Sequence, residues 1–275
     1  MLFFSVTSIS PVCFSMFGVD IYWYGIAYIV SIWLALFYAK KLAGKGDILI
    51  ETVPGTLQYG LISSEKLRQY IDSFLPLACV GIVAGGRLGH VIFFDILYYA
   101  KNLPKVLCIR DGGMSFHGGL IGIILAAAWF THQKKIRLIS YLDLLAMVAP
   151  IGLAIGRLAN FVNSELYGTP TTLPWGVFFH DTFEPRHPTQ IYEALTEGVL
   201  TLTILAIFYK LKQKRRPGEL SIVFLLCYGI SRILIDFVKD SSHYMGFTVG
   251  QWLSIAMILG GVLIMYTFSR QHKLT

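Results

Sequence analysis

The sequence predicts an all-α fold, a bundle of about seven transmembrane helices that uses nearly the whole chain. Of the 275 residues, 55% are hydrophobic and only 14% are charged, and the mean hydropathy is +0.62. Soluble domains are about a quarter charged. The apolar runs are close to the ~20 residues that a helix needs to cross a bilayer, and they are too long for barrel strands. The predicted helices are Tyr22–Tyr38, Phe74–Phe94, Phe116–Phe130, Ile139–Gly156, Gln190–Tyr209, Leu220–Phe237 and Thr248–Phe268.

The distribution of positive charge predicts the orientation of this bundle. Fifteen Lys and Arg residues lie in one set of loops and five in the other, and loops rich in Lys and Arg stay in the cytoplasm. The C-terminus is therefore expected in the cytoplasm and, with an odd number of spans, the N-terminus outside. We expect one transmembrane domain over residues 1–275, with outward loops near residues 95–116, 158–188 and 238–247. Because the net charge of +7 gathers beside apolar runs, it indicates a membrane protein and not a nucleic-acid binder.

The first predicted span opens on Trp23-Tyr24-Gly25, and aromatic side chains commonly mark a membrane interface. The preceding MLFFSVTSIS lacks a basic segment and a small-residue cleavage site, so we expect it to be retained and not cleaved as a signal peptide. The four cysteines show no CxxC or Cys/His spacing, and no metal site is expected.

The second and third spans combine small residues with a few polar ones. Arg87 and His90 lie inside the second span and need polar partners, which Glu193 or another acid could supply. His117 lies at the outward end of the third span, within Asp111–Leu120, and a histidine titrates near neutral pH. Glycines spaced four residues apart predict close helix packing. There are three such groups: Gly81 with Gly85 and Gly89; Gly118 with Gly122; and Gly152 with Gly156.

The most unusual polar cluster follows the fourth span, in GRLANFVNSELYG at Gly156–Gly168. If the helix continues past Gly156, then Arg157 and Asn160 share one face. An arginine near the centre of a membrane helix costs ~2.5–3.5 kcal/mol. Anchoring at the interface is an alternative for Arg157 alone, but it does not explain a segment that also contains Asn163 and Glu165.

The sixth span carries a second polar stripe. Tyr228, Arg232 and Asp236 are spaced four residues apart and share one helical face. An internal ion pair between Arg232 and Asp236 is one explanation. A site with two arginines, Arg157 and Arg232, that suits a phosphate is the other. HPTQIYE, which begins at His187, enters the fifth span and could form a polar lining.

These segments together resemble the prolipoprotein diacylglyceryl transferase family of the bacterial inner membrane. Seven residues of the segment Gly156–Gly168 match the family pattern. They are Gly156, Arg157, Asn160, Phe161, Asn163, Glu165 and Gly168. The resemblance extends to WYG at Trp23–Gly25, GGMSFHGGL at Gly112–Leu120, HPTQIYE at His187–Glu193 and Tyr228-Gly229 with Arg232. Asp236 and Lys239 depart from it, because the family often has glutamate and arginine there. Lysine lacks the bidentate geometry of arginine.

The resemblance implies a transferase that moves the diacylglyceryl group of phosphatidylglycerol to the lipobox cysteine of prolipoproteins, forms a thioether and releases glycerol phosphate. It implies that Arg157, Asn160 and Arg232 bind phosphatidylglycerol. It also implies a base for the thiol, for which His117 is the first candidate and Tyr24 the second. Glu165 and Asp236 would position the arginines, and Gly168 would permit a tight loop; Asn163, His187 and Tyr228 would support the site. No cofactor or metal is implied, and the site would open toward the periplasmic leaflet.

Other classes of membrane protein explain these residues less well. Embedded charges also mark the ion paths of transporters, so a small-molecule or ion transporter is the leading alternative. The sequence shows no internal repeat of the kind that many transporters contain. An intramembrane protease is disfavoured because GxSxG, HExxH and a pair of intramembrane aspartates are missing.

Overall fold

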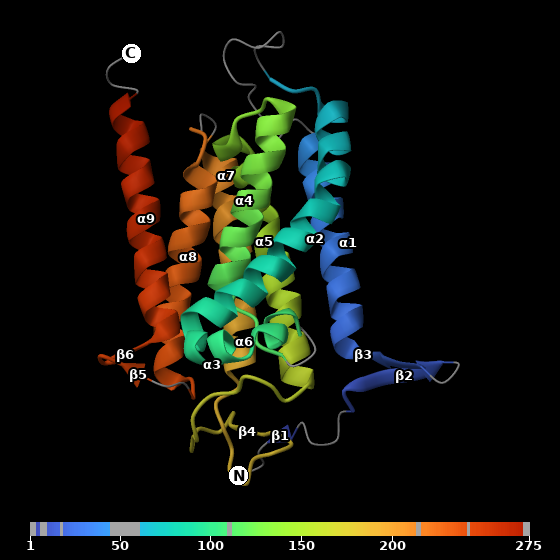
Figure 1. The fold of residues 1–275 in the computed structure, drawn as a ribbon, viewed down its shortest axis with the longest axis vertical. Helices are drawn as coiled ribbons and strands as arrows, with labels where there is room; N and C mark the ends of the chain where they lie inside the picture. Colours follow the sequence, from blue (N-terminus) through green and yellow to red (C-terminus); the bar gives the residue numbers. More distant parts are fainter. Residues whose placement is uncertain are drawn as a thin grey trace. The chain divides into compact units, whose positions relative to one another are not determined.

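The computed structural model describes residues 4–5, 10–16, 19–44, 61–108, 112–212, 216–240 and 243–271. Asp111, at the start of the predicted histidine segment, and parts of the predicted outward loops at 95–116 and 238–247 lie outside the described residues. Each predicted apolar run forms a helix (Figure 1). These helices are α1 (Trp23–Gly44), α2 (Ser64–Phe94), α4 (Phe116–Lys134), α5 (Leu138–Val162), the continuous helix Thr189–Leu211, α8 (Glu219–Ile235) and α9 (Val249–Gln271).

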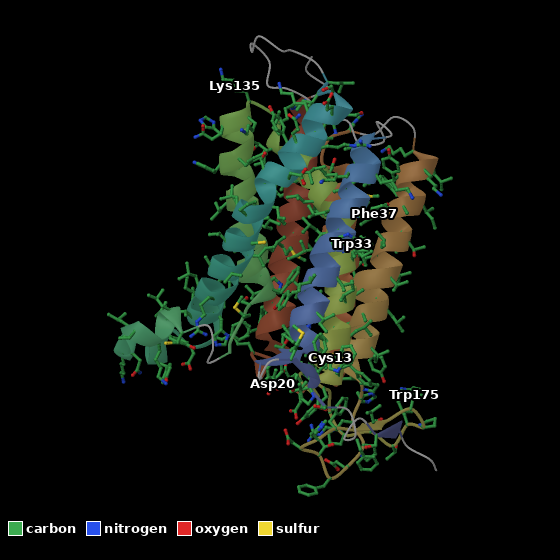
Figure 2. All side chains as sticks on the ribbon, turned by 90° about the vertical axis from the view of Figure 1, so that its right-hand side faces the viewer. Cys13, Asp20, Trp33, Phe37, Lys135 and Trp175 are labelled. Carbon is green, nitrogen blue, oxygen red and sulfur yellow. The ribbon has the colours of Figure 1, made fainter. Side chains whose placement is uncertain are left out.

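The multi-pass membrane character predicted from composition is confirmed. Among the described residues, five helices are long and apolar enough to cross a membrane, and α9 is apolar over the shorter stretch Val249–Leu263. On α1, the side chains of Ile29, Trp33 and Phe37 are 70%, 63% and 58% exposed, and Trp33 and Phe37 lie along the side of the helix (Figure 2). Such an exposed apolar stripe is expected where a helix faces lipid. The five helices are Trp23–Gly44, Ser64–Phe94, Leu138–Val162, Thr189–Leu211 and Glu219–Val238.

Several helices extend beyond their apolar runs because capping residues and polar turns continue them. Helix α2 starts at Ser64, ten residues before the predicted Phe74. The Ser63 hydroxyl caps it by accepting a hydrogen bond from the Lys66 amide. Helix α4 starts as predicted at Phe116, where Ser115 accepts a bond from the Gly118 amide. A serine that accepts such a bond is a favourable N-cap.

The chain divides into two compact units, residues 39–145 and the combination of 1–38 with 146–275. In the first unit α2 and α4 pack together along the predicted glycine seam. A Cβ built on Gly85 would lie 2.5 Å from the Gly118 carbonyl oxygen, so only glycine permits this approach. Gly152 and Gly156 were predicted to pack in the same way, which is wrong, because nothing lies within 4 Å of a Cβ built on either.

Arg87 in α2 holds the segment that follows this helix, which comprises α3 (Ile96–Lys101) and η1 (Leu103–Leu107). Its guanidinium donates to the carbonyls of Lys105 and Val106 at 2.6 and 2.9 Å, and it also donates to the Gly112 carbonyl. The described partners of Arg87 are thus backbone carbonyls and the Tyr99 ring in its own unit, while the cations on Glu193 are Arg157, Arg232 and Lys239.

The second unit contains residues 146–162 of α5, the helix Thr189–Leu211, α8 and α9; α8 and α9 lie side by side (Figure 1). The helix Thr189–Leu211 is built from α6 (Thr189–Glu193), a π-helical turn η3 (Ala194–Leu200) and α7 (Thr201–Leu211). A 3-10 turn, η4 (Asp236–Val238), continues α8.

Short strands in this unit connect the ends of these helices and were not predicted. A parallel pair joins β1 (Phe4–Ser5) to β4 (Val177–Phe178), and two antiparallel hairpins join β2 (Val12–Met16) to β3 (Val19–Tyr22) and β5 (His243–Tyr244) to β6 (Phe247–Thr248). The loop from 163 to 188 is held over the helix ends by a small apolar core. This core comprises Phe161, Tyr167, Val177 and Phe179.

Candidate active site

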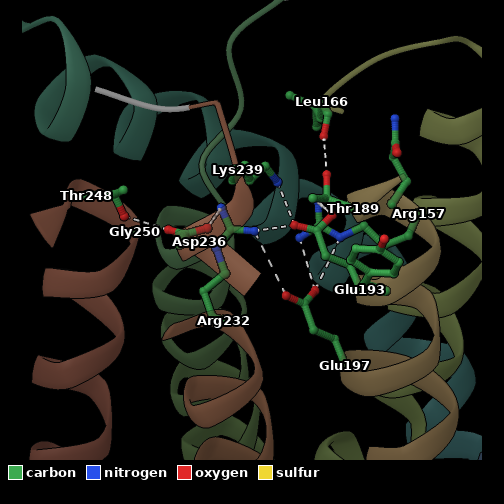
Figure 3. A network of polar contacts seen from close by, with 12 residues as sticks. Arg157, Leu166, Thr189, Glu193, Glu197, Arg232, Asp236, Lys239, Thr248 and Gly250 are labelled. Atoms are coloured by element: carbon green, nitrogen blue, oxygen red, sulfur yellow. Dashed lines mark hydrogen bonds and ion pairs between the residues drawn. The ribbon is translucent and has the colours of Figure 1, made fainter. Parts of the chain in front are cut away.

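The two arginines predicted to act together, Arg157 and Arg232, meet at a pair of buried glutamates (Figure 3). Arg157 comes from the C-terminal part of α5 and Arg232 from α8, while Glu193 and Glu197 lie on the helix Thr189–Leu211. Both glutamate side chains are 0% exposed, and the arginine side chains are 14% and 15% exposed. Both carboxylates are therefore fully buried, while each arginine side chain keeps a small exposed fraction.

Glu193 is the hub of this network, because its carboxylate contacts three cations. One oxygen, Oε1, accepts hydrogen bonds from Arg232 Nη1 and Lys239 Nζ, both at 2.5 Å. The other, Oε2, lies 3.3 Å from Arg157 Nη1. Charge-assisted contacts of this kind are short and strong, so Glu193 fixes the distance between the two arginines.

Glu197 contributes the second carboxylate, four residues further along the helix. Its Oε2 accepts from Arg157 Nη2 at 3.1 Å and Nε at 3.3 Å, whereas Oε1 lies 4.0 Å from Arg232 Nη1. Arg157 is thereby oriented through all three of its guanidinium nitrogens. The asymmetry between the two oxygens of Glu197 distinguishes it from Glu193.

Asp236 orients Arg232 from the other side. Its Oδ1 lies 3.0 Å from Arg232 Nη2, which confirms the ion pair suggested by the spacing of four residues. Its Oδ2 accepts from Thr248 Oγ1 at 2.6 Å. Thr248 and Gln251 exchange hydrogen bonds of 2.9 and 3.0 Å between side chains and amides, which is a capping box at the start of α9. The N-terminal cap of α9 thus fixes an arginine on α8.

A close contact between helices lets Arg157 reach both glutamates. A Cβ built on Gly198, in the π-helical turn, would lie 2.5 Å from the Ala154 Cβ on α5. Turns of the π type are frequent at functional sites. Glycine at this position brings the α5 backbone against the turn that carries Glu197, within reach of the Arg157 side chain.

The segment Gly156–Gly168, which we call the signature segment, continues past Arg157 and out of α5. Asn160 is buried, and its Nδ2 donates to Glu165 Oε2 at 3.3 Å. Glu165 is exposed, and its own carbonyl accepts a bond from Gln190 Nε2 at 2.5 Å. Glu165 was expected to position the arginines, but the carboxylates on Arg157 are Glu193 and Glu197. The buried Oδ1 of Asn163 accepts no hydrogen bond from the described residues.

Gly168 occupies a position where the structure has room for glycine alone. Its amide donates to the His187 carbonyl at 2.9 Å and its backbone pairs with that of Lys239. A Cβ built on Gly168 would lie 2.3 Å from the Val238 carbonyl oxygen. The tight loop that Gly168 was expected to permit stays a prediction; the observed backbone contact joins the signature segment to the end of the sixth span.

Three further site residues were predicted, Tyr228, Tyr24 and His187, and each has different surroundings in the structure. Tyr228 is 1% exposed on α8, one turn before Arg232. The half-buried Tyr24 packs edge-on against Tyr28, with ring centroids 5.0 Å apart. His187 Nδ1 lies 3.2 Å from the Tyr192 hydroxyl.

His117 is buried at the start of α4 and belongs to the unit formed by residues 39–145. Arg157 and Arg232 belong to the other unit. The role of His117 as a base therefore stays a prediction, as does that of Tyr24.

Two polar groups just outside the apolar spans have shifted pKa values. Burial, reinforced by the positive charge of Arg232 and opposed by Glu193, lowers the pKa of Lys239 to about 8. Burial also lowers the pKa of His187, so its ring is neutral at pH 7. Among the described residues, no group of three His, Cys, Asp or Glu side chains is arranged to hold a metal ion.

Glu193 and Glu197 are the functional residues that sequence reasoning missed. Glu193 was assigned to a polar lining or to a pairing with Arg87, and Glu197 was not singled out. The signal was present, because two acids four residues apart in an apolar run need cations, and two embedded arginines need acids.

Comparison with known proteins identifies the family to which this chain belongs. The family model described as prolipoprotein diacylglyceryl transferase matches residues 11–267. Among similar curated proteins, a phosphatidylglycerol--prolipoprotein diacylglyceryl transferase of Agrobacterium fabrum is 40% identical over 92% of this chain and 87% of its own length. A protein with the same name from Wolbachia pipientis is 38% identical over 94% of both chains. The chain belongs to the prolipoprotein diacylglyceryl transferase family.

Proposed function

We propose that this protein transfers the diacylglyceryl group of phosphatidylglycerol to the lipobox cysteine of prolipoproteins, the first step of lipoprotein maturation. The observation that supports this most is the pair of partly accessible arginines, Arg157 and Arg232, held by buried carboxylates. Planar guanidinium groups suit a phosphate, because each can donate two parallel hydrogen bonds. The names of the relatives provide the substrates.

The reaction is a displacement at a glycerol carbon of the lipid. The sulfur of the cysteine forms a bond to this carbon, and the carbon–oxygen bond breaks with its electron pair going to the phosphate oxygen. The products are a thioether and glycerol phosphate. The phosphate gains negative charge as the bond breaks, and Arg157 and Arg232 stabilise it, which is commonly the largest catalytic contribution. Asn160 orients a phosphate or glycerol oxygen.

The thiol proton requires an acceptor. A cysteine thiol has a pKa near 8.5, and only a few per cent is thiolate at neutral pH. We assign the acceptor role to His117, since an imidazole titrates near neutrality. Tyr24 is the second candidate, although a phenol with an ordinary pKa near 10 is a poor acceptor at pH 7.

The proposed position of the site, on one side of the membrane, rests on the positive-inside rule and on the substrates. Seven spans with the C-terminus in the cytoplasm would place the ends of α5 and α8, and with them the arginines, on the periplasmic side of the inner membrane. Phosphatidylglycerol and the signal peptide of a prolipoprotein would reach the site within that leaflet. Transport of a small molecule or ion, the alternative function, has no support from the family match.

The transfer reaction tests this function directly. Purified protein in vesicles of phosphatidylglycerol is mixed with a lipobox peptide, and the mass of the peptide is followed. The wild type should add one diacylglyceryl group, Arg157→Ala should add none while remaining folded, and a peptide with serine in place of cysteine should stay unmodified. Full activity of Arg157→Ala would refute the proposed role of this site.

A further inference from the structure

The network contains equal numbers of positive and negative groups. All three of its carboxylates are 0–1% exposed. Since an uncompensated buried charge is costly, a balanced network is the favourable state without lipid. Its cations are Arg157, Arg232 and Lys239, and its carboxylates are Glu193, Glu197 and Asp236.

Phosphatidylglycerol disturbs this balance, because its phosphodiester carries one negative charge at any pH near neutral. Binding it to the two arginines would leave the network with one excess negative charge in a poorly solvated site. Either that charge is tolerated, at the cost expected for a buried ion, or a proton enters with the lipid. A proton on one carboxylate would restore the balance.

We propose that the network takes up one proton when it binds the phosphodiester, and that Glu197 receives it. This inference rests on the proposed lipid substrate. It makes the site a receptor whose affinity for an anion is linked to protons, and not a fixed pair of cations.

Glu197 is identified by comparing the oxygens of the three carboxylates. Both oxygens of Glu193 lie within 3.3 Å of a cation, and both oxygens of Asp236 lie within 3.0 Å of a partner. Three of the six oxygens are buried and accept no hydrogen bond from the described residues: Glu193 Oε2, Asp236 Oδ1 and Glu197 Oε1. The first two lie 3.3 and 3.0 Å from a guanidinium nitrogen, whereas Glu197 Oε1 lies 4.0 Å from Arg232 Nη1. This oxygen is the least compensated of the six, so a proton placed there breaks the fewest contacts.

The groups that face Glu197 come from each element around it. Arg157 approaches from α5, Arg232 and Tyr228 from α8, Glu193 from the preceding turn, and Lys239 from beyond η4. Lys239 is the competing proton acceptor, because its pKa is about 8 and an added anion would raise it. At pH 7 Lys239 is already mostly protonated and can take up only a small fraction of a proton.

Calorimetry of lipid binding at pH 7 tests the inference. The probe is dihexanoyl phosphatidylglycerol added to the purified protein in detergent, in two buffers that differ in their ionisation enthalpy. The difference between the two heats gives the number of protons taken up. For the wild type we expect well over half a proton per lipid. Glu197→Gln, which is permanently neutral there, should still bind the lipid but take up none.

Two further variants assign the proton. Lys239→Arg keeps the positive charge but cannot titrate, and it should retain the full uptake. Glu219→Gln is the matched control, because it removes a carboxylate at the other end of α8, where Glu219 accepts from Lys212 at 2.6 Å; its uptake should equal that of the wild type.

The outcomes separate this inference from the proposed function. Binding heat without proton uptake in the wild type overturns the inference alone, and this measurement does not depend on any variant being folded. Uptake that persists in Glu197→Gln, or that vanishes in Lys239→Arg, places the proton elsewhere and also overturns it. No binding heat in either buffer contradicts the lipid substrate and the inference together.

Discussion

Replacing the hub carboxylate, Glu193→Gln, is the perturbation whose consequence the structure defines most clearly. Glutamine has the same shape but no charge, and its amide nitrogen would face a cation where an oxygen now accepts. The substitution weakens the contacts to Arg232 and Lys239 at 2.5 Å and to Arg157 at 3.3 Å together. It leaves three cations facing two carboxylates in a buried site.

The expected size of the effect follows from burial. Removing one partner of a buried ion pair costs about 3–5 kcal/mol, since the remaining charge is uncompensated. For a chain of this size that corresponds to a fall in the melting temperature of roughly 6–20 °C. Transfer activity should fall as well, because the two arginines lose the group that sets their distance.

The assay is thermal unfolding of the purified protein in detergent, followed by tryptophan fluorescence, with transfer activity measured at a temperature where both proteins are folded. Glu184→Gln is the control: this carboxylate is 57% exposed and lies 4.0 Å from Arg186. An exposed pair contributes about 1 kcal/mol or less. If both variants melt within a degree or two of the wild type, Glu193 does not hold the network together.

Three other changes give distinct results. Gly168→Ala should greatly reduce transfer because the added Cβ meets the Val238 carbonyl oxygen, whereas Gly152→Ala, with nothing within 4 Å, should leave transfer unchanged; equal activities would contradict the need for glycine at 168. His117→Gln should slow transfer, with a loss that shrinks as the pH approaches the thiol pKa near 8.5; an unaffected rate at every pH would exclude the base role. Because the unfolded chain binds the Lys239 proton more tightly than the folded protein does, the free energy of unfolding should rise by ~2–3 kcal/mol from pH 8 to pH 10. Lys239→Gln should remove that rise in denaturation measurements, and a rise that persists would contradict the shifted pKa.

The helices were predictable because each apolar run must satisfy its own backbone hydrogen bonds in lipid. Their polar ends were harder to predict. Ser64–Ser73 extends α2 beyond its apolar run, and hydropathy alone does not detect a polar turn that a serine caps. The short strands were not predicted either, because pairs such as Phe4–Ser5 with Val177–Phe178 depend on contacts between segments far apart in the chain.

In the site, the cations were predicted more fully than their partners. Arg157 and Arg232 stand out because a charge inside an apolar run is costly, and Asp236 follows from its spacing to Arg232. Glu193 and Glu197 were harder to assign, since sequence does not say which acid meets which arginine. The resemblance implied that Glu165 positions the arginines, but five residues after Asn160 the chain has turned out of the helix, and Glu165 accepts a hydrogen bond from Asn160 instead.

The most direct test of the central claim is a structure of the protein with phosphatidylglycerol bound. The proposed function predicts that the phosphate lies within hydrogen-bond distance, about 3 Å, of the guanidinium groups of Arg157 and Arg232. It also predicts that the glycerol carbon next to the phosphate faces the side from which a peptide thiol can approach. A phosphate bound elsewhere, with both arginines still saturated by Glu193 and Glu197, would contradict it.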